Sequence, residues 1–176
     1  MDAARDFRSF IFSPIVIFVV RCLIGFSIGF FLMKQFPQYD FFWALLSIML
    51  VISPEGKDSP RLTTERVKAN LIGALSGFVV VFLPFSLFIK AIIAITVTAI
   101  ICNAIKLLGV SRSAIVAVII ILIEKPDEGY LASIERFSFV LIGCLIGLIV
   151  VVTTGYMIRF VHKNWLKAEY KLKNLK

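Results

Sequence analysis

The most constraining feature of the sequence is a segment that it contains twice. Residues 65–81 read ERVKANLIGALSGFVVV, and residues 135–151 read ERFSFVLIGCLIGLIVV, 70 positions later and without a gap. Nine of the seventeen positions are identical, among them a Glu-Arg pair and two glycines four residues apart. Apolar bias alone produces Leu and Val matches, but it does not readily place charged residues and glycines in register. We therefore expect two copies of one three-helix unit.

Composition indicates that these units lie in a membrane. Hydrophobic residues make up 60% of the chain and charged residues 17%, whereas a soluble domain carries about a quarter charged residues. The 176 residues suit six helical spans of about 20 residues each. The net charge of +8 is then read as membrane topology and contact with anionic lipid, not as nucleic-acid binding.

Six apolar segments predict six transmembrane helices, at residues 14–33, 41–52, 67–83, 88–103, 110–123 and 137–157. The predicted fold is an all-α integral membrane protein with six transmembrane helices arranged as two inverted three-helix repeats. The expected divisions are a cytoplasmic N-terminal segment (1–13), a first repeat (14–83), a second repeat (84–157) and a basic cytoplasmic tail (158–176). We expect this tail to form either a basic helix on the inner leaflet or a frayed, solvated end.

The inversion follows from the odd number of helices in each unit. A repeated three-span unit must enter the membrane in opposite senses, so a pseudo-two-fold axis lies in the membrane plane, as is common among secondary transporters. Lys and Arg residues set the orientation, with fourteen on one predicted side and four (Lys34, Lys90, Lys125 and Arg136) on the other. Both termini are therefore expected in the cytoplasm, at a bacterial inner membrane.

Cationic residues are the candidates for binding an anion. Arg21 lies about seven residues inside the first span, where a charge is costly unless it is paired or faces water. It is expected either to attract an anion or to extend to the headgroups, and if it attracts an anion its neutralisation should abolish flux. Lys90 is its near-counterpart in the second half, and its position near the outer interface favours the headgroup interpretation.

The repeated Glu-Arg pair places Arg66 and Arg136 at matching helix starts, expected at opposite faces of the membrane. Arg112, between Ser111 and Ser113, opens the fifth helix, where it could hold an oxyanion or where a serine could serve as an N-cap. Phe41, Phe42 and Trp43 are read as an interfacial aromatic cluster.

The glycine pairs Gly73/Gly77 and Gly143/Gly147 each place two glycines on one helix face, which favours close helix packing over a ligand role. If the third and sixth helices cross at these glycines, they form the central seam. The cysteines Cys22, Cys102 and Cys144 are expected to be packing residues, and the single His162 makes a histidine-based site improbable. The sequence predicts no catalytic residues, no cofactor and no metal.

Residues 41–77, FFWALLSIMLVISPEGKDSPRLTTERVKANLIGALSG, resemble the membrane module of the fusaric-acid-resistance and aromatic-acid-exporter proteins. The matching features are Trp43, Pro54, and Arg66 ahead of the Gly73-Ala74-Leu75-Ser76-Gly77 run. The resemblance also implies a relation to the malate-type anion channels of plants.

The resemblance implies six spans, export or conduction of organic anions such as carboxylates, and a role for Arg66 by similarity. It also implies a homodimer or higher homo-oligomer, with membrane lipids and the organic anion as the other partners. The alternative is a non-transporting scaffold or accessory subunit, which predicts a sealed apolar bundle without a cavity. A lipid-modifying membrane enzyme is weaker, because the sequence offers it no nucleophile or metal ligands.

Overall fold

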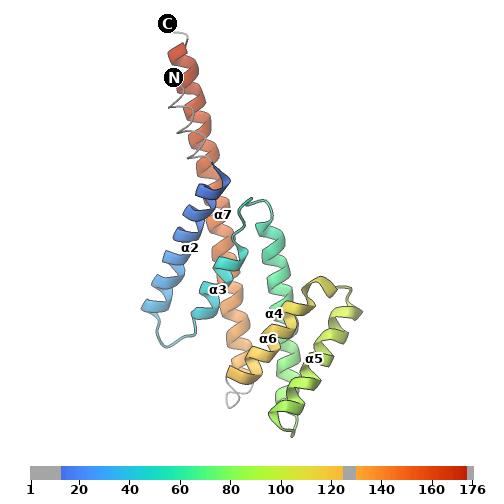
Figure 1. Ribbon diagram of the computed structural model, residues 1–176. Helices are drawn as coiled ribbons and strands as arrows, with labels where there is room; N and C mark the ends of the chain where they lie inside the picture. The colour runs from blue at the N-terminus through green and yellow to red at the C-terminus, as the bar shows by residue number, and fades with distance from the viewer. Residues whose placement is uncertain (1–12, 125–129, 174–176) are drawn as a thin grey trace.

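The computed structural model describes residues 13–124 and 130–173, which form six α-helices and one short 3-10 helix (Figure 1). The helices are α2 (Pro14–Gln35), α3 (Phe42–Val51), α4 (Ser59–Val81), α5 (Leu87–Ala104), α6 (Ser111–Glu124) and α7 (Tyr130–Lys173), with η1 (Leu108–Val110) ahead of α6. Along the chain the helices run alternately in opposite directions, so α2 begins and α7 ends at the same end of the bundle (Figure 1). The predicted N-terminal segment lies almost wholly outside the described residues.

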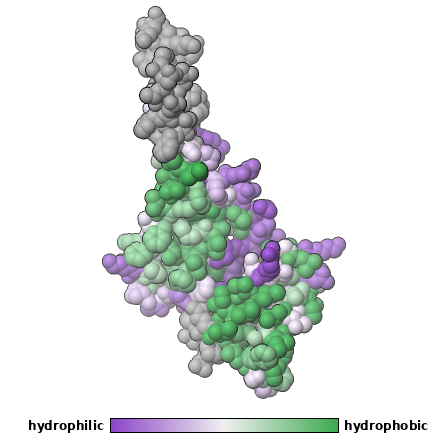
Figure 2. Space-filling model, viewed as in Figure 1, coloured by the Kyte–Doolittle hydropathy of each residue, from purple (hydrophilic) through white to green (hydrophobic). Residues whose placement is uncertain are grey.

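Three of the described helices are long and apolar enough to cross a membrane: α2, α5 and residues 133–165 within α7. Within their apolar stretches only 17% of residues are buried in α2 and in α5, against 44% in α7. The apolar side chains that α2 and α5 leave exposed include Ile15, Phe31 and Phe88. On the face shown in Figure 2, hydrophobic residues cover much of the described surface, and hydrophilic ones gather toward the α3–α4 connection. The chain is therefore an all-helical integral membrane protein with α2 and α5 at its periphery.

Three predicted helix boundaries, one in α4 and two in α7, are wrong. α4 begins at Ser59, eight residues before the predicted start, because Pro60 suits the first helical turn and the polar stretch after it continues as helix. α7 runs from Tyr130 to Lys173 without a break, seven residues before and sixteen residues after the predicted span. Arg66 and Arg136 consequently lie about two turns inside their helices and not at the helix starts, roughly 9–11 Å along the axis from the first residue.

The glycines of α4 and α7 do not face each other. Gly73 lies against the carbonyl oxygen of Ala114 on α6, where an added Cβ would be 2.8 Å from that oxygen. Gly143 lies against the backbone of Ala44 on α3, where an added Cβ would be 2.8 Å from the Ala44 carbonyl carbon. The expected seam of facing glycines is therefore replaced by two separate glycine contacts, α4 with α6 and α7 with α3.

These two contacts correspond residue by residue. Gly143 lies 70 positions after Gly73, and Ala114 lies 70 positions after Ala44. One helical turn further on, Gly147 meets Ile48 and Val51, while Gly77 meets Val118 and Ile121, again 70 positions apart. The repeated sequence thus makes the same packing twice, with short α3 and α6 each seated on the long helix of the other half.

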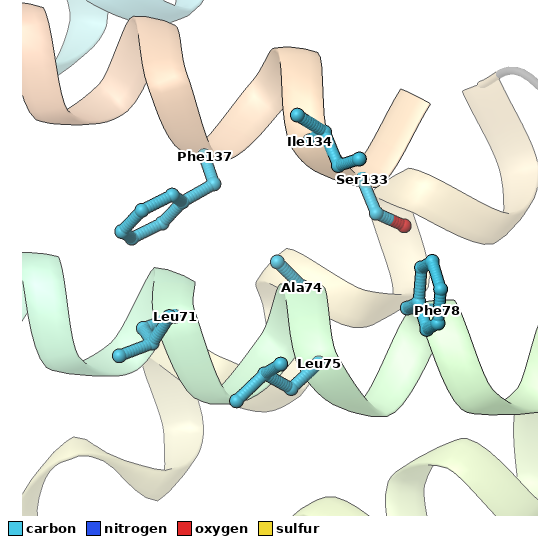
Figure 3. Close-up of a pocket in the computed structure, with 7 residues that line it drawn as sticks. All are labelled: Leu71, Ala74, Leu75, Phe78, Ser133, Ile134 and Phe137. Atoms are coloured by element: carbon cyan, nitrogen blue, oxygen red, sulfur yellow. The ribbon is translucent and has the colours of Figure 1, made fainter. Parts of the chain in front are cut away.

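α4 and α7 contact each other through a different, apolar surface. A crevice of about 260 Å³ lies between them. Figure 3 shows its lining side chains, which are Leu71, Ala74, Leu75 and Phe78 from α4 and Ser133, Ile134 and Phe137 from α7. Among its described lining residues Ser133 is the one polar side chain and none is charged, so the crevice has no cation to attract an anion.

Candidate functional site

A pocket of about 480 Å³ lies where α3, α4, α6 and α7 come together. It combines three arginines with an amide, a hydroxyl and an aromatic ring, and its described lining residues include no carboxylate. The lining residues are Trp43, Leu46, Leu50, Arg66, Asn70, Gly109, Arg112, Ser113, Val116, Ala117, Ile120 and Arg136. We call this the central pocket.

Several lining residues of the central pocket are also related by the offset of 70 positions. Four pairs of its lining residues are related in this way: Trp43 with Ser113, Leu46 with Val116, Leu50 with Ile120, and Arg66 with Arg136. Arg66 and Arg136 each lie at about the second turn of a long helix, and these two helices, α4 and α7, run in opposite directions (Figure 1). Equivalent positions of the two halves therefore build one site.

Arg66 is half-buried and is held by neutral groups. Its Nε donates to the hydroxyl of Ser47, at 3.2 Å, and Ser47 in turn donates to the Trp43 carbonyl, at 2.7 Å. The backbone carbonyl of Arg66 accepts from the Asn70 side-chain amide, at 3.0 Å. No described carboxylate lies within ion-pair distance of Arg66, so much of its charge remains available to an incoming anion.

Arg136 is buried, and its guanidinium lies 3.5 Å from the centre of the Trp43 ring. A cation over an indole face is a favourable electrostatic contact, and it fixes the plane of the guanidinium. Trp43 is 8% exposed and lines the central pocket, while Phe42 beside it is exposed. The repeat could have indicated this, because Ser113, 70 positions later, lines the pocket as well.

Arg112 and Ser113 reach the central pocket from the first turn of α6, and Arg112 is exposed. Ser111 begins the helix, and its hydroxyl donates to the Leu108 carbonyl at 2.8 Å. The helix start therefore presents a cation and a hydroxyl to the same volume as Arg66 and Arg136.

The other two candidate cations lie elsewhere. Lys90 donates from Nζ to the Val81 carbonyl at 2.9 Å, which satisfies the last residue of α4, and it does not line the central pocket. Arg21 lies in a different pocket, between α2, the α3–α4 connection and α7. Arg136 and Gly155, which lines that pocket, are 19 residues apart on α7, about 28 Å along the axis.

Comparison with protein families identifies the family to which the chain belongs. A family model described as "Fusaric acid resistance protein-like" matches residues 14–150, which span α2 to α6 and most of the apolar part of α7. The chain belongs to this family. Searches of curated proteins and of solved structures give no match.

The fusaric acid resistance protein-like family is a family of membrane transport and efflux proteins, and this places the chain in that functional class. The matched region contains Arg66, Arg112 and Arg136, so the whole central pocket lies inside it. Among the described residues no group of three His, Cys, Asp or Glu side chains could hold a metal ion.

Proposed function

We propose that the chain transports organic anions, such as aromatic or aliphatic carboxylates, through the central pocket, and that it exports them. The observation that carries this proposal is the convergence of Arg66, Arg112 and Arg136 on one pocket whose described lining holds no carboxylate. A volume of about 480 Å³ falls within the range of small-ligand sites, roughly 300–1,000 Å³. A carboxylate in this pocket would lie beside three guanidinium groups, which attract and orient it.

The mechanism we propose uses the repeat. The chain would be two inverted three-helix units, 14–83 and 84–157, related by a pseudo-two-fold axis in the membrane plane. The paired contacts of Gly73 with Ala114 and Gly143 with Ala44 support this, as does the common origin of the lining residues. In such folds the substrate site lies at the interface of the repeats, and rocking of one unit against the other exposes it to each side in turn.

The proposal places both termini in the cytoplasm and the protein in a bacterial inner membrane, since fourteen of the loop and terminal cations fall on that side. It includes a homodimer or higher homo-oligomer as the working assembly. The alternative of a non-transporting scaffold or accessory subunit has less support, because it does not account for a polar pocket lined by arginines at the interface of the repeats.

The test is anion flux in vesicles that contain the purified protein, with a panel of aromatic and aliphatic carboxylates and with or without a pH gradient. Arg66→Gln and Arg136→Gln should each lower flux at least tenfold, because each removes a charge that faces the anion. Lys68→Gln is the matched control: it removes one charge from an exposed position of the same helix, outside the pocket, and should stay within about twofold of wild type. Unchanged flux in both arginine variants would remove the central pocket from the mechanism.

A further inference from the structure

A second cationic pocket lies at the end of the bundle where α2 begins. Its volume is about 360 Å³, and it is enclosed by α2, the α3–α4 connection and α7. The lining residues are Ile17, Arg21, Glu55, Gly56, Lys57, Val151, Val152, Gly155, Ile158 and Arg159. We call it the terminal pocket. It holds three cations and one carboxylate.

Arg21 forms the buried base of the terminal pocket, with 6% of its surface exposed. Its Nε donates to the Thr154 hydroxyl at 3.1 Å, and its Nη1 lies 3.5 Å from the Ser53 carbonyl oxygen. Both partners are neutral, and no described carboxylate lies within ion-pair distance. A buried guanidinium held by neutral acceptors keeps its full charge, which favours an anion in the adjoining space.

The one carboxylate of the pocket is already engaged. Glu55 pairs with Lys57, with Nζ and Oε2 2.6 Å apart, and both side chains are largely exposed. The hydrogen bond from Lys57 and its charge hold the pKa of Glu55 below the ordinary value. Glu55 therefore compensates Lys57, and among the described residues no carboxylate lies within ion-pair distance of Arg21 or Arg159.

Two glycines leave room beside these arginines. Gly56 has φ +69°, a left-handed conformation that favours glycine, and an added Cβ there would lie 2.6 Å from Nη1 of Arg21. At Gly155 an added Cβ would lie 3.7 Å from Nη2 of Arg21 and 3.9 Å from Nη2 of Arg159. Because both Nη2 atoms lie within 4 Å of one point, they are less than 8 Å from each other. Two like charges at this separation repel unless an anion lies between them.

We propose that the terminal pocket binds a phosphate-class oxyanion between Arg21 and Arg159, over Gly155. Guanidinium groups bind phosphate oxygens through paired, charge-assisted N–H donors, and a tetrahedral phosphate group, free or in a lipid headgroup, has acceptor oxygens that can face both guanidinium groups at once. The phosphate group comes either from an anionic lipid headgroup, which suits a pocket at the end of the membrane helices, or from solution. This site is distinct from the central pocket and does not depend on transport.

The test uses delipidated, full-length protein in a neutral detergent at fixed ionic strength. One arm titrates inorganic phosphate; the other adds phosphatidylglycerol in mixed micelles, with phosphatidylcholine as the neutral comparison. We expect saturable binding in at least one arm: the phosphate arm would identify a soluble ligand, and a response to phosphatidylglycerol alone would identify a lipid headgroup.

The decisive variant is Gly155→Ala, which places a methyl group at the point between the two guanidinium groups. The added methyl group would lie 3.7 and 3.9 Å from the two Nη2 atoms, which are ordinary van der Waals distances. Because alanine also favours the helix more than glycine does, the melting temperature should not fall. Binding should nevertheless weaken at least tenfold, as it should in Arg159→Gln. Lys163→Gln removes an exposed charge from the same helix outside the pocket and should bind within twofold of wild type.

Absence of binding in both arms overturns the proposal, and so does wild-type binding by Gly155→Ala or by Arg159→Gln. The Arg66→Gln variant separates this site from the transport proposal. It should lose flux and keep phosphate or phosphatidylglycerol binding, so each proposal can fail without the other.

Discussion

Replacing Gly143 by alanine tests the packing that brings α3 onto α7. An added Cβ would lie 2.8 Å from the carbonyl carbon and from the Cα of Ala44, and these backbone atoms cannot rotate away as a side chain can. Overpacking of this kind costs about 1–3 kcal/mol or more, whereas alanine for glycine in a helix gains about 1 kcal/mol. Taking the upper end because the contact is with backbone, we expect a net loss of about 2 kcal/mol.

The measurement is thermal unfolding of the detergent-solubilised protein. For a chain of this length 1 kcal/mol corresponds to about 2–4 °C, so Gly143→Ala should lower the melting temperature by about 4–8 °C. Gly73→Ala should behave alike, because its added Cβ meets the Ala114 carbonyl oxygen and Ala117 Cβ, each at 2.8 Å.

Gly77→Ala is the matched control on the same face of α4. Its nearest neighbours would be side-chain atoms of Ile121 and Val118, at 3.3 and 3.4 Å, which require only a small adjustment. The clash and the gain in helix propensity are then of similar size, and the melting temperature should change by less than about 4 °C. A Gly143→Ala protein that melts within about 2 °C of wild type, with Gly77→Ala lower, would refute the glycine contacts as described.

Two further predictions concern single side chains. In a Trp165→Phe background Trp43 is the remaining tryptophan. Binding of an aromatic carboxylate in the central pocket should therefore change the fluorescence of Trp43 in a saturable way. A titration with a transported substrate that leaves the fluorescence unchanged would exclude binding beside that ring. Lys90→Met removes the hydrogen bond to the Val81 carbonyl and should lower stability by about 1 kcal/mol, or about 2–4 °C, with flux close to wild type; a large loss of flux at unchanged stability would instead give Lys90 a role in the pathway.

Much of the helix pattern could be predicted from the sequence, because the apolar segments and the prolines mark where spans begin and end. The bounds of α2, α3, α5 and α6 agree with the prediction within about two residues. The start of α4 and the ends of α7 were missed, because hydropathy reports the apolar part of a helix and not its polar continuation. The spacing of the glycines indicated close helix packing. Which helices they contact, α3 and α6, could not be predicted, because this depends on how the helices are arranged in space.

The cationic residues of the site could be predicted from the sequence, but their convergence on one pocket could be predicted only in part. Arg66, Arg112 and Arg136 were identified as candidate cations, but the sequence placed Arg66 and Arg136 at opposite faces, and the structure brings all three to one pocket. Arg21 and Lys90 have the same charge and lie apart from it, since the rotation and depth of each helix decide which side chains converge. Trp43 was assigned to the interface because aromatic residues near span ends are common there, and local sequence cannot report that Arg136 would cover its ring.

The unbroken course of α7 has a mechanical consequence. A helix of 44 residues is a rod of about 66 Å, and it is gripped by α3 near Gly143 and Gly147. From that fulcrum Arg136 is about 13 Å away in one direction and Lys173 about 42 Å in the other. A rigid tilt that shifts Arg136 by 1 Å would therefore swing the far end by roughly 3 Å in the opposite sense. A molecule that binds the C-terminal end of α7 and displaces it by about 3 Å would therefore shift Arg136 by about 1 Å.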